Sequence, residues 1–179
     1  LRSRELIRYF DGTFGRGGHY RALKKCFPQM HAVVLDQDDE AEKYAVEEFK
    51  TEVQNQELRF IKQNFSQFSE LNLGVFDMML LDLGVSSPQL DKAERGFSFY
   101  QQGPLDMRMN QQSELTAEMI INTWSEKDLT SIFQKYGEVH RPHRVIRAII
   151  HDRKTKAFTE TQQLAGLIER VDGWRRKGV

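Results

Sequence analysis

Four short apolar segments alternate with helix-like segments in the first half of the chain. Most of them end at an acidic or polar residue, and they lie at residues 6–10, 31–36, 58–62 and 76–82. Mostly apolar runs of this length are typical of strands in a parallel sheet that is covered on both faces. Residues 18–27 and 38–53 lie between these segments and have a helical composition. The alternation therefore predicts a doubly wound α/β sheet.

The second half of the chain follows a different pattern. Residues 83–112 contain glycine, serine and proline without a clear period, which indicates a long functional loop. Helical patterns follow this loop. We expect a first helix over residues 116–124 and a second from an N-cap at Ser125 to a glycine C-cap at Gly137. A third is expected over 139–153. A fourth, over 160–171, would begin with a capping box of Thr159 and Gln162.

The net charge of zero conceals a gradient along the 179 residues. Lysine and arginine together number 26, as do aspartate and glutamate, but residues 1–131 carry a net charge of −6 and residues 132–179 a net charge of +6. An acidic front and a basic tail suggest two surfaces with different partners. A random excess on solvated helices explains the gradient equally well.

Composition restricts the classes of protein that the chain can belong to. No run approaches the roughly 18 apolar residues that a membrane helix needs, and the first residues do not resemble a signal peptide. The single cysteine, Cys26, cannot form an internal disulfide, which fits a reducing, cytoplasmic compartment. His140 and His143 have no third ligand at metal spacing, so we expect no metal site. The oligomeric state is left open.

A glycine-rich loop, DGTFGRGGH, follows the first predicted strand at residues 11–19. Between a strand and a helix, glycines allow a tight turn and let a nucleotide-type cofactor approach the backbone. Asp36 ends the second predicted strand, where a carboxylate can accept hydrogen bonds from ribose hydroxyls or cap the next helix. In an open parallel sheet the polar strand ends should meet at one edge, and they are Asp11, Asp36, Asn64 and Asp82.

Several motifs together resemble the RsmH (MraW) family of S-adenosylmethionine-dependent methyltransferases, which modify the exocyclic N4 amine of a cytidine in bacterial 16S rRNA. The motifs are DGTFGRGGH, VLDQD, LLDLGVSSPQLD, ERGFSF and GPLDMRM. The resemblance implies a Rossmann-like methyltransferase core with an inserted all-α subdomain. It divides the chain into the N-terminal part of the core at 1–90, an active-site loop at 91–112 and a helical substrate-binding subdomain at 113–179. Chains of this family extend further at both ends, so we expect an incomplete sheet.

The resemblance also implies a site for S-adenosylmethionine. Carried over by position, the binding residues are Gly17, Gly18, His19, Asp36, Phe65, Asp82 and Gln89. Phe65 would lie against the adenine, or would instead be a core aromatic. Asp11 is a reasonable further partner, because a carboxylate favours the positive sulfonium.

The predicted reaction methylates a poor nucleophile, since the lone pair of the cytosine amine is delocalised into the ring. The sulfonium is already an activated donor, so that positioning dominates catalysis. Many amino-methyltransferases carry a D/N-P-P-Y/F turn after the fourth strand, where this chain has Asp82, Leu83, Gly84 and Val85. We expect Asp82, or a carbonyl beside it, to accept a hydrogen bond from the amine. A role for Asp82 in cofactor binding alone is the alternative.

Contacts to rRNA are predicted on the loop and on the third helix after it. The candidates on the loop are Arg95, Phe97, Phe99 and Arg108, and those on the helix include Arg144, Arg147 and Arg153. An extruded cytosine could stack on the loop aromatics while arginines meet phosphates. The loop residues could instead lock the loop onto the core, and the helix arginines could form a solvated face. The implied partner is 16S rRNA within the small ribosomal subunit, and no membrane.

Two other functions fit parts of the pattern. A dinucleotide-dependent oxidoreductase would need the spacing G-x-G-x-x-G, whereas the glycines here are at 12, 15, 17 and 18. A non-catalytic RNA-binding or ribosome-assembly factor that retains the methyltransferase fold is the alternative from a different class. Methyl transfer to RNA distinguishes that factor from the enzyme.

Overall fold

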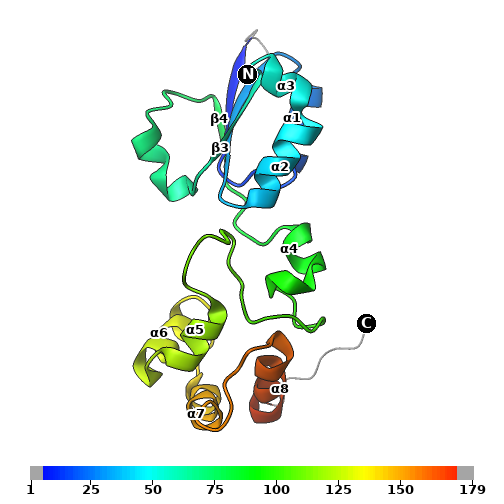
Figure 1. Cartoon of the computed structure of the whole chain (residues 1–179). Helices are drawn as coiled ribbons and strands as arrows, with labels where there is room; N and C mark the ends of the chain where they lie inside the picture. Colours follow the sequence, from blue (N-terminus) through cyan, green and yellow to red (C-terminus); the bar gives the residue numbers. More distant parts are fainter. Residues whose placement is uncertain (1–5, 173–179) are drawn as a thin grey trace. The chain divides into compact units, whose positions relative to one another are not determined.

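A parallel sheet of four strands organises the first part of the chain (Figure 1). In the computed structural model, which describes residues 6–172, the strand order is β3-β2-β1-β4. The strands are β1 (Ile7–Asp11), β2 (Met30–Asp36), β3 (Leu58–Lys62) and β4 (Met78–Leu80). Every neighbouring pair is parallel. The predicted α/β fold with a parallel, Rossmann-like sheet is therefore confirmed.

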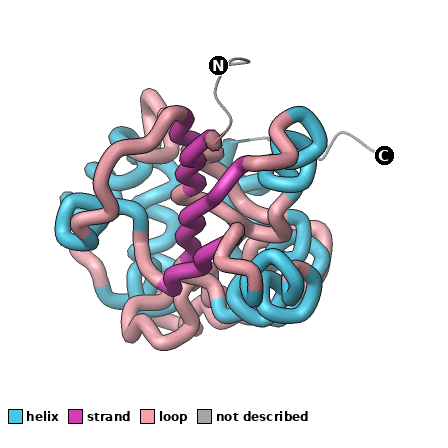
Figure 2. Tube along the Cα trace, turned by 90° about the horizontal axis from the view of Figure 1, so that it is seen from above, coloured by secondary structure: helices cyan, strands magenta, loops and turns pink. Residues whose placement is uncertain are grey.

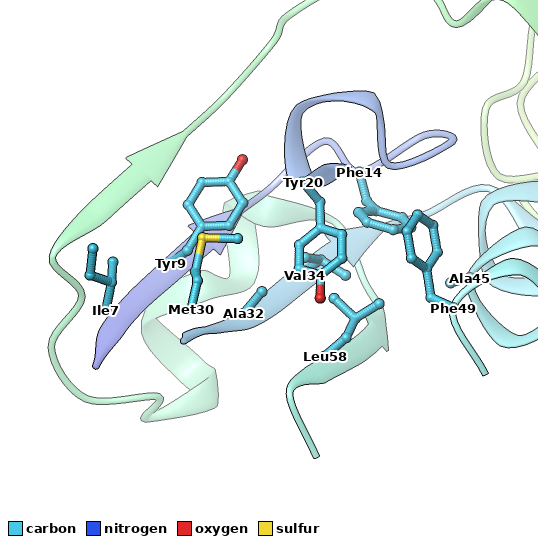
Figure 3. Packing of buried hydrophobic residues seen from close by; sticks show 10 residues of the cluster. All are labelled: Ile7, Tyr9, Phe14, Tyr20, Met30, Ala32, Val34, Ala45, Phe49 and Leu58. Atoms are coloured by element: carbon cyan, nitrogen blue, oxygen red, sulfur yellow. The ribbon is translucent and has the colours of Figure 1, made fainter. Parts of the chain in front are cut away.

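One face of the sheet buries a continuous core. The register pairs Ile7 with Met30 and Tyr9 with Ala32, so that alternate residues of neighbouring strands point to the same side. Their side chains pack against Phe14, Tyr20 and Phe49 (Figure 3). The rings of Phe14 and Phe49 meet edge to face at 5.5 Å between centroids, a favoured aromatic geometry.

Three helices cover this face, and Figure 1 shows them on one side of the strands. They are α1 (Gly18–Cys26), α2 (Asp39–Glu48) and α3 (Lys50–Gln54). The helix predicted at 18–27 is thus confirmed, whereas the one predicted at 38–53 is two helices that meet at Phe49. That residue has φ −116°, outside the helical region, and its ring is buried in the core. Burial of one aromatic side chain therefore interrupts a stretch with good helical composition.

The opposite face of the sheet is covered differently. A 3₁₀ segment, η1 (Phe65–Leu71), connects β3 to β4 and lies on this side (Figure 1). Phe10 of β1 packs here against Phe68 and Phe76, at 4.7 and 5.4 Å between ring centroids.

The fourth strand is shorter and more exposed than the sequence predicts. The apolar run 76–82 predicts a buried strand that ends at Asp82, but β4 covers only Met78–Leu80, and Met79 is 58% exposed. β4 pairs with β1 alone among the described strands, over Tyr9–Asp11. Asp82 lies two residues beyond the strand. An apolar run marks a strand here, but the strand is shorter than the run.

Among the described residues, 87–108 and 112–172 form a second compact unit. Within residues 6–172 the named strands all belong to the first unit, and the second consists of helices and loops. The strands are the magenta segments of Figure 2. Its elements are α4 (Ser87–Asp91), η2 (Ala93–Arg95), α5 (Ala117–Thr123), α6 (Glu126–Lys135), α7 (His143–Asp152) and α8 (Thr161–Asp172). The predicted loop 83–112 thus contains two short helical turns. Throughout the described residues, no helix combines the length and apolarity needed to cross a membrane.

The helix boundaries of the second unit follow local capping, with two corrections to the predicted caps. Ser125 accepts a hydrogen bond from the Asp128 N–H, as predicted. At the other end of α6, Glu138 rather than Gly137 takes the left-handed conformation, with φ 53°. The capping glutamine of α8 is Gln163 rather than Gln162. Its Oε1 accepts from the N–H groups of Thr159 and Glu160, because α8 begins one residue later than predicted.

The second unit has its own apolar core. Val145, Ile146 and Ile149 lie on one face of α7 and are at most 2% exposed. They pack with Leu129 of α6 and Leu167 of α8. A helix with one apolar face buries that face against its neighbours. The sequence predicts a longer helix here, over 139–153, but α7 begins after Pro142. Proline suits the start of a helix.

Candidate cofactor site

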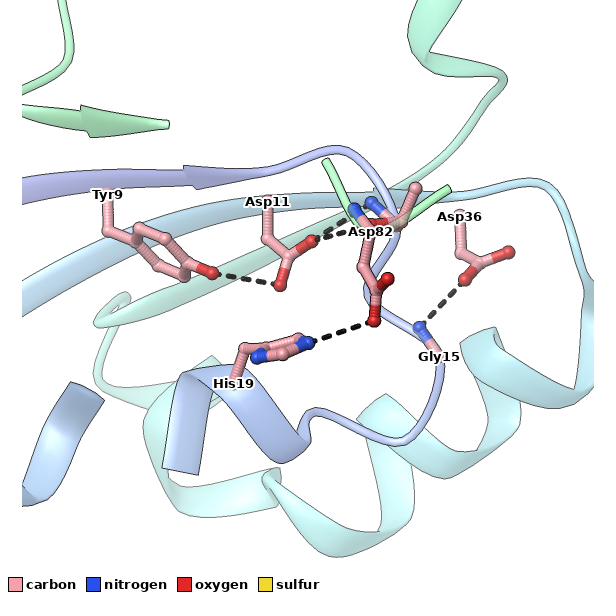
Figure 4. A network of polar contacts seen from close by, with 7 residues as sticks. Tyr9, Asp11, Gly15, His19, Asp36 and Asp82 are labelled. Atoms are coloured by element: carbon pink, nitrogen blue, oxygen red, sulfur yellow. Dashed lines mark hydrogen bonds and ion pairs between the residues drawn. The ribbon is translucent and has the colours of Figure 1, made fainter. Parts of the chain in front are cut away.

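Asp11 is a buried carboxylate at the carboxyl end of β1. Its side chain is fully buried and accepts three hydrogen bonds, one from the Tyr9 hydroxyl at 2.9 Å and two from Thr13, at 3.0 Å from the backbone N–H and 3.3 Å from the hydroxyl (Figure 4). Burial raises the pKa of this carboxyl above its usual value, and the Thr13 and Tyr9 hydrogen bonds and the nearby His19 oppose that rise. Asp11 is therefore a buried carboxyl group whose position is fixed by the chain around it.

Asp36 lies at the end of the neighbouring strand β2 and anchors the glycine-rich loop. Its Oδ2 accepts a hydrogen bond from the Gly15 N–H at 2.8 Å, and its Oδ1 accepts one from the Asp38 N–H at 3.0 Å. Burial raises the pKa of the Asp36 carboxyl, and these two backbone hydrogen bonds oppose the rise. The N-cap of α2 is Asp38, whose side chain accepts from the Glu40 N–H. Asp36 is thus not the cap of that helix.

Asp82 follows β4 and faces the first helix. Its Oδ2 lies 3.2 Å from Nε2 of His19 in the first turn of α1 (Figure 4). The two side chains are 67% and 49% exposed, respectively. The backbone N–H of Asp82 donates to the Thr13 hydroxyl at 2.7 Å. In contrast to Asp11, Asp82 is therefore accessible to a ligand.

The glycine-rich loop owes its shape to two different requirements. Gly17 has φ +67°, and a Cβ at this position would lie 2.6 Å from the ring of Phe49 and 2.7 Å from that of Phe14. A side chain at Gly17 would therefore collide with the core that holds the loop. At Gly18, by contrast, a Cβ would meet no atom within 4 Å. Gly17 thus serves packing, whereas Gly18 leaves open space beside the start of α1.

The segment after β3 adds a partly buried aromatic and an amide pair to the same edge. Phe65 lies close to the end of β1, since a Cβ built on Gly12 would approach the Phe65 Cβ to 2.9 Å. Asn64 donates from Nδ2 to Gln37 Oε1 at 3.0 Å, and the Gln37 amide contacts Met109 Sδ at 3.4 Å. The structure therefore brings together the loop glycines, Asp11, His19, Asp36, Phe65 and Asp82, the predicted cofactor residues of the first unit.

The remaining predicted site residues lie in the second unit. Gln89 in α4 is buried, and its cofactor role stays a prediction. Arg95 is 2% exposed, donates to the Arg108 carbonyl at 3.0 Å and lies over the Phe97 ring at 5.9 Å. Arg108 pairs with Asp106 at 2.7 Å, which lowers the pKa of the Asp106 carboxyl. These contacts are of the kind that lock a loop, and RNA binding by Arg95, Phe97, Phe99 and Arg108 stays a prediction.

The basic residues of α7 divide into two groups. Arg144 and Arg147 are exposed, as a surface that binds phosphates requires. Arg153, the C-cap of α7, instead forms hydrogen bonds within the protein, since its Nη1 donates to the carbonyls of Ile121 and Trp124 at 2.8 and 2.9 Å. It caps the end of α5. Within residues 6–172, no three His, Cys, Asp or Glu side chains gather as metal ligands would.

Two residues of this edge were not singled out by the sequence reasoning. Tyr9 and Thr13 donate the three hydrogen bonds described above that hold the Asp11 carboxylate. Both lie two residues from Asp11, one within the strand and one beyond it. A polar residue that points to the same side as a strand-end acid is the signal that could have found Tyr9.

The chain resembles known proteins along its length. The model of the MraW methylase family matches residues 1–178. A protein named ribosomal RNA small subunit methyltransferase H from Bdellovibrio bacteriovorus is 66% identical over 178 residues, which cover 99% of this chain and 54% of that protein. Proteins of the same name from Halothermothrix orenii and Trichodesmium erythraeum are 40% and 42% identical, and the match covers 99% and 87% of this chain and 58% and 54% of theirs.

The chain thus spans about half the length of the curated relatives that it matches. The match includes the glycine-rich loop and the three strand-end acids described above. With the family model and these identities, the chain belongs to the MraW methylase family.

Proposed function

We propose that the chain provides the cofactor-binding part of an enzyme that transfers a methyl group from S-adenosylmethionine to the exocyclic N4 amine of a cytidine in 16S rRNA. The observation that carries this proposal is the meeting of Asp11, Asp36 and Asp82 with an open glycine-rich loop at the carboxyl edge of one parallel sheet. The names of the relatives support the rRNA substrate. Action on the small ribosomal subunit in the cytoplasm follows from that substrate and is part of the proposal.

The donor set of this edge fits S-adenosylmethionine. Each Asp36 carboxylate oxygen holds one backbone N–H, and a carboxylate oxygen can accept a further hydrogen bond, here from a ribose hydroxyl. Open space at Gly18 allows close approach to the backbone. Phe65 offers an apolar surface to the adenine near the end of β1. Near the buried Asp11, Asp82 offers an exposed carboxylate that would favour a sulfonium cation.

The main task of these residues in the reaction would be to position the methyl donor and the amine. S-adenosylmethionine supplies, when bound, a methyl group that is already activated on a sulfonium. Asp82 would accept a hydrogen bond from the cytosine amine, which localises the nitrogen lone pair toward that methyl group. Asp82 or water would take the proton that the amine loses when it is methylated. The exposed Asp82 side chain is suited to this role because it can reach a substrate.

The second unit would contribute to RNA recognition. The exposed Arg144 and Arg147 of α7 would contact phosphates, whose contribution to affinity depends strongly on salt. We assign the active-site loop to residues 91–112 and the substrate-binding subdomain to residues 113–179, of which 173–179 lie outside the described residues. Gln89 completes the proposed cofactor set.

Methyl transfer from tritium-labelled S-adenosylmethionine tests the proposal. The purified protein is incubated with deproteinised 16S rRNA and, separately, with small ribosomal subunits, and Asp36→Ala serves as the control for transfer that depends on the site. We expect label on the N4 amine of a cytidine. Binding of the cofactor without transfer to either RNA would contradict the enzyme and favour a non-catalytic assembly factor that retains the fold.

A further inference from the structure

Thr13 lies between the ends of two neighbouring strands and contacts the acid that follows each of them. On the side of β1, its backbone N–H and its hydroxyl lie 3.0 and 3.3 Å from Asp11 Oδ1. On the side of β4, its hydroxyl oxygen lies 2.7 Å from the backbone nitrogen of Asp82. The same two strand ends are tied by a hydrogen bond from the Gly12 N–H to the Leu80 carbonyl at 3.0 Å.

The direction of these hydrogen bonds is fixed by the chemistry of the groups. A backbone N–H only donates, so the Thr13 oxygen is the acceptor toward Asp82. The hydroxyl proton is then directed to Asp11 Oδ1, which also receives the Thr13 N–H. The Thr13 hydroxyl therefore joins a buried carboxylate to the backbone that carries an exposed one.

We propose that Thr13 is a positioning residue for the cationic end of the cofactor, because its hydroxyl links the backbone of Asp82, two residues beyond β4, to the side chain of Asp11 at the end of β1. This inference rests on the proposed function, since it concerns the sulfonium site. Thr13 does not itself react. It acts through two carboxylates whose separation and charge determine how well a cation binds between the strand ends.

The hydroxyl also affects the charge of Asp11. Burial raises the pKa of the Asp11 carboxyl, and the hydrogen bond from the Thr13 hydroxyl is one of the contacts that lower it. The titratable groups that face Asp11 are Tyr9 on its own strand and His19 on α1. Loss of the hydroxyl leaves this surrounding set in place and raises the pKa of Asp11 further. Cofactor binding should then fail at a higher pH.

The experiment compares the unsubstituted protein with Thr13→Val, which removes the hydroxyl but keeps the shape, and Thr13→Ser, which keeps the hydroxyl. Thr123→Val is the matched control, because its exposed hydroxyl donates to the Met119 carbonyl within α5. The dissociation constant of S-adenosylmethionine is measured by calorimetry across acidic to neutral pH. Hydrogen exchange of the Asp82 amide, measured by NMR without cofactor, reports the geometry independently of binding.

We expect Thr13→Val to weaken binding about tenfold, as loss of one hydrogen bond to a charged group implies, and to move the acidic limit of binding to higher pH. The Asp82 amide should exchange faster in this variant alone, while Thr13→Ser and Thr123→Val match the unsubstituted protein. Equal binding by Thr13→Val, or equal loss in Thr13→Ser, would overturn the inference. Failure of the unsubstituted protein to bind the cofactor would instead contradict the proposed function.

Discussion

The two units use the charged residues at their predicted sites in different ways. In the first unit, the acids Asp11, Asp36 and Asp82 come from different strands and meet because parallel strands end at one edge. In the second unit, Arg95 and Arg153 donate hydrogen bonds to backbone carbonyls, whereas Arg147 is exposed. The polar residues at the ends of parallel strands therefore lie together at one edge of the sheet. In the helical unit, an arginine is at least partly buried or is exposed according to whether backbone carbonyls lie within its reach.

The largest expected effect comes from Arg95 of the second unit. Arg95→Ala removes a buried guanidinium that bonds the Arg108 carbonyl and lowers the pKa of Asp106, so the unfolding free energy should fall by about 3 kcal/mol. Urea unfolding followed by far-UV circular dichroism measures the loss. Arg147→Ala is the control, because an exposed arginine should change stability by less than about 0.5 kcal/mol. Equal stability of the two variants would remove the distinction between buried and exposed arginines.

The next effect concerns Asp82, the exposed acid of the first unit. Asp82→Asn should leave the fold intact and lower methyl transfer at least about tenfold, because the exposed carboxylate proposed to accept the amine proton is lost. The measurement is transfer of labelled methyl to rRNA at saturating cofactor. A parallel calorimetric titration of the cofactor separates a role in turnover from one in binding. If cofactor affinity and turnover are both unchanged, Asp82 has neither role.

Two buried tyrosines of the first unit, one with a hydrogen-bond partner for its hydroxyl and one without, test how much such a partner contributes to stability. The Tyr20 hydroxyl is buried without a hydrogen-bond partner among the described residues, so Tyr20→Phe should be neutral or stabilise by up to about 1 kcal/mol. Tyr9→Phe makes the same change but deprives Asp11 of a donor at 2.9 Å, and should destabilise by about 1 kcal/mol. Chemical denaturation measures both. A larger loss in Tyr20→Phe than in Tyr9→Phe would contradict this account of the core.

The smallest effect is expected at the exposed arginines of α7. Arg147→Ala should weaken RNA binding by a few-fold at every RNA sequence and reduce the slope of log affinity against log salt by about one. Filter binding over a range of salt concentrations measures this. The control is Arg170→Ala, since Arg170 is already paired with Asp152 at 2.6 Å. Identical salt slopes in the unsubstituted protein and Arg147→Ala would exclude a phosphate contact.

The sequence predicts the sheet and the residues at its edge better than it predicts helix breaks, strand lengths and side-chain contacts. Apolar runs that end in an acid mark β1 and β2, and the parallel topology follows from their alternation with helices. The break at Phe49 and the short β4 depend on tertiary packing and strand pairing, which no local pattern contains. The commitment of Arg153 to the carbonyls of Ile121 and Trp124 likewise appears only once α5 and α7 are packed.

The central claim, that the carboxyl edge of the first-unit sheet binds S-adenosylmethionine, is tested most directly by calorimetric titration of the cofactor into the protein and into Asp36→Ala. Asp36 would hold two ribose hydroxyls, and each hydrogen bond to a charged group contributes about 1.5 kcal/mol or more, so the variant should bind about 100-fold more weakly. Arg147→Ala should bind the cofactor as the unsubstituted protein does. Equal affinity of the protein and Asp36→Ala, or no binding by either, would contradict the claim.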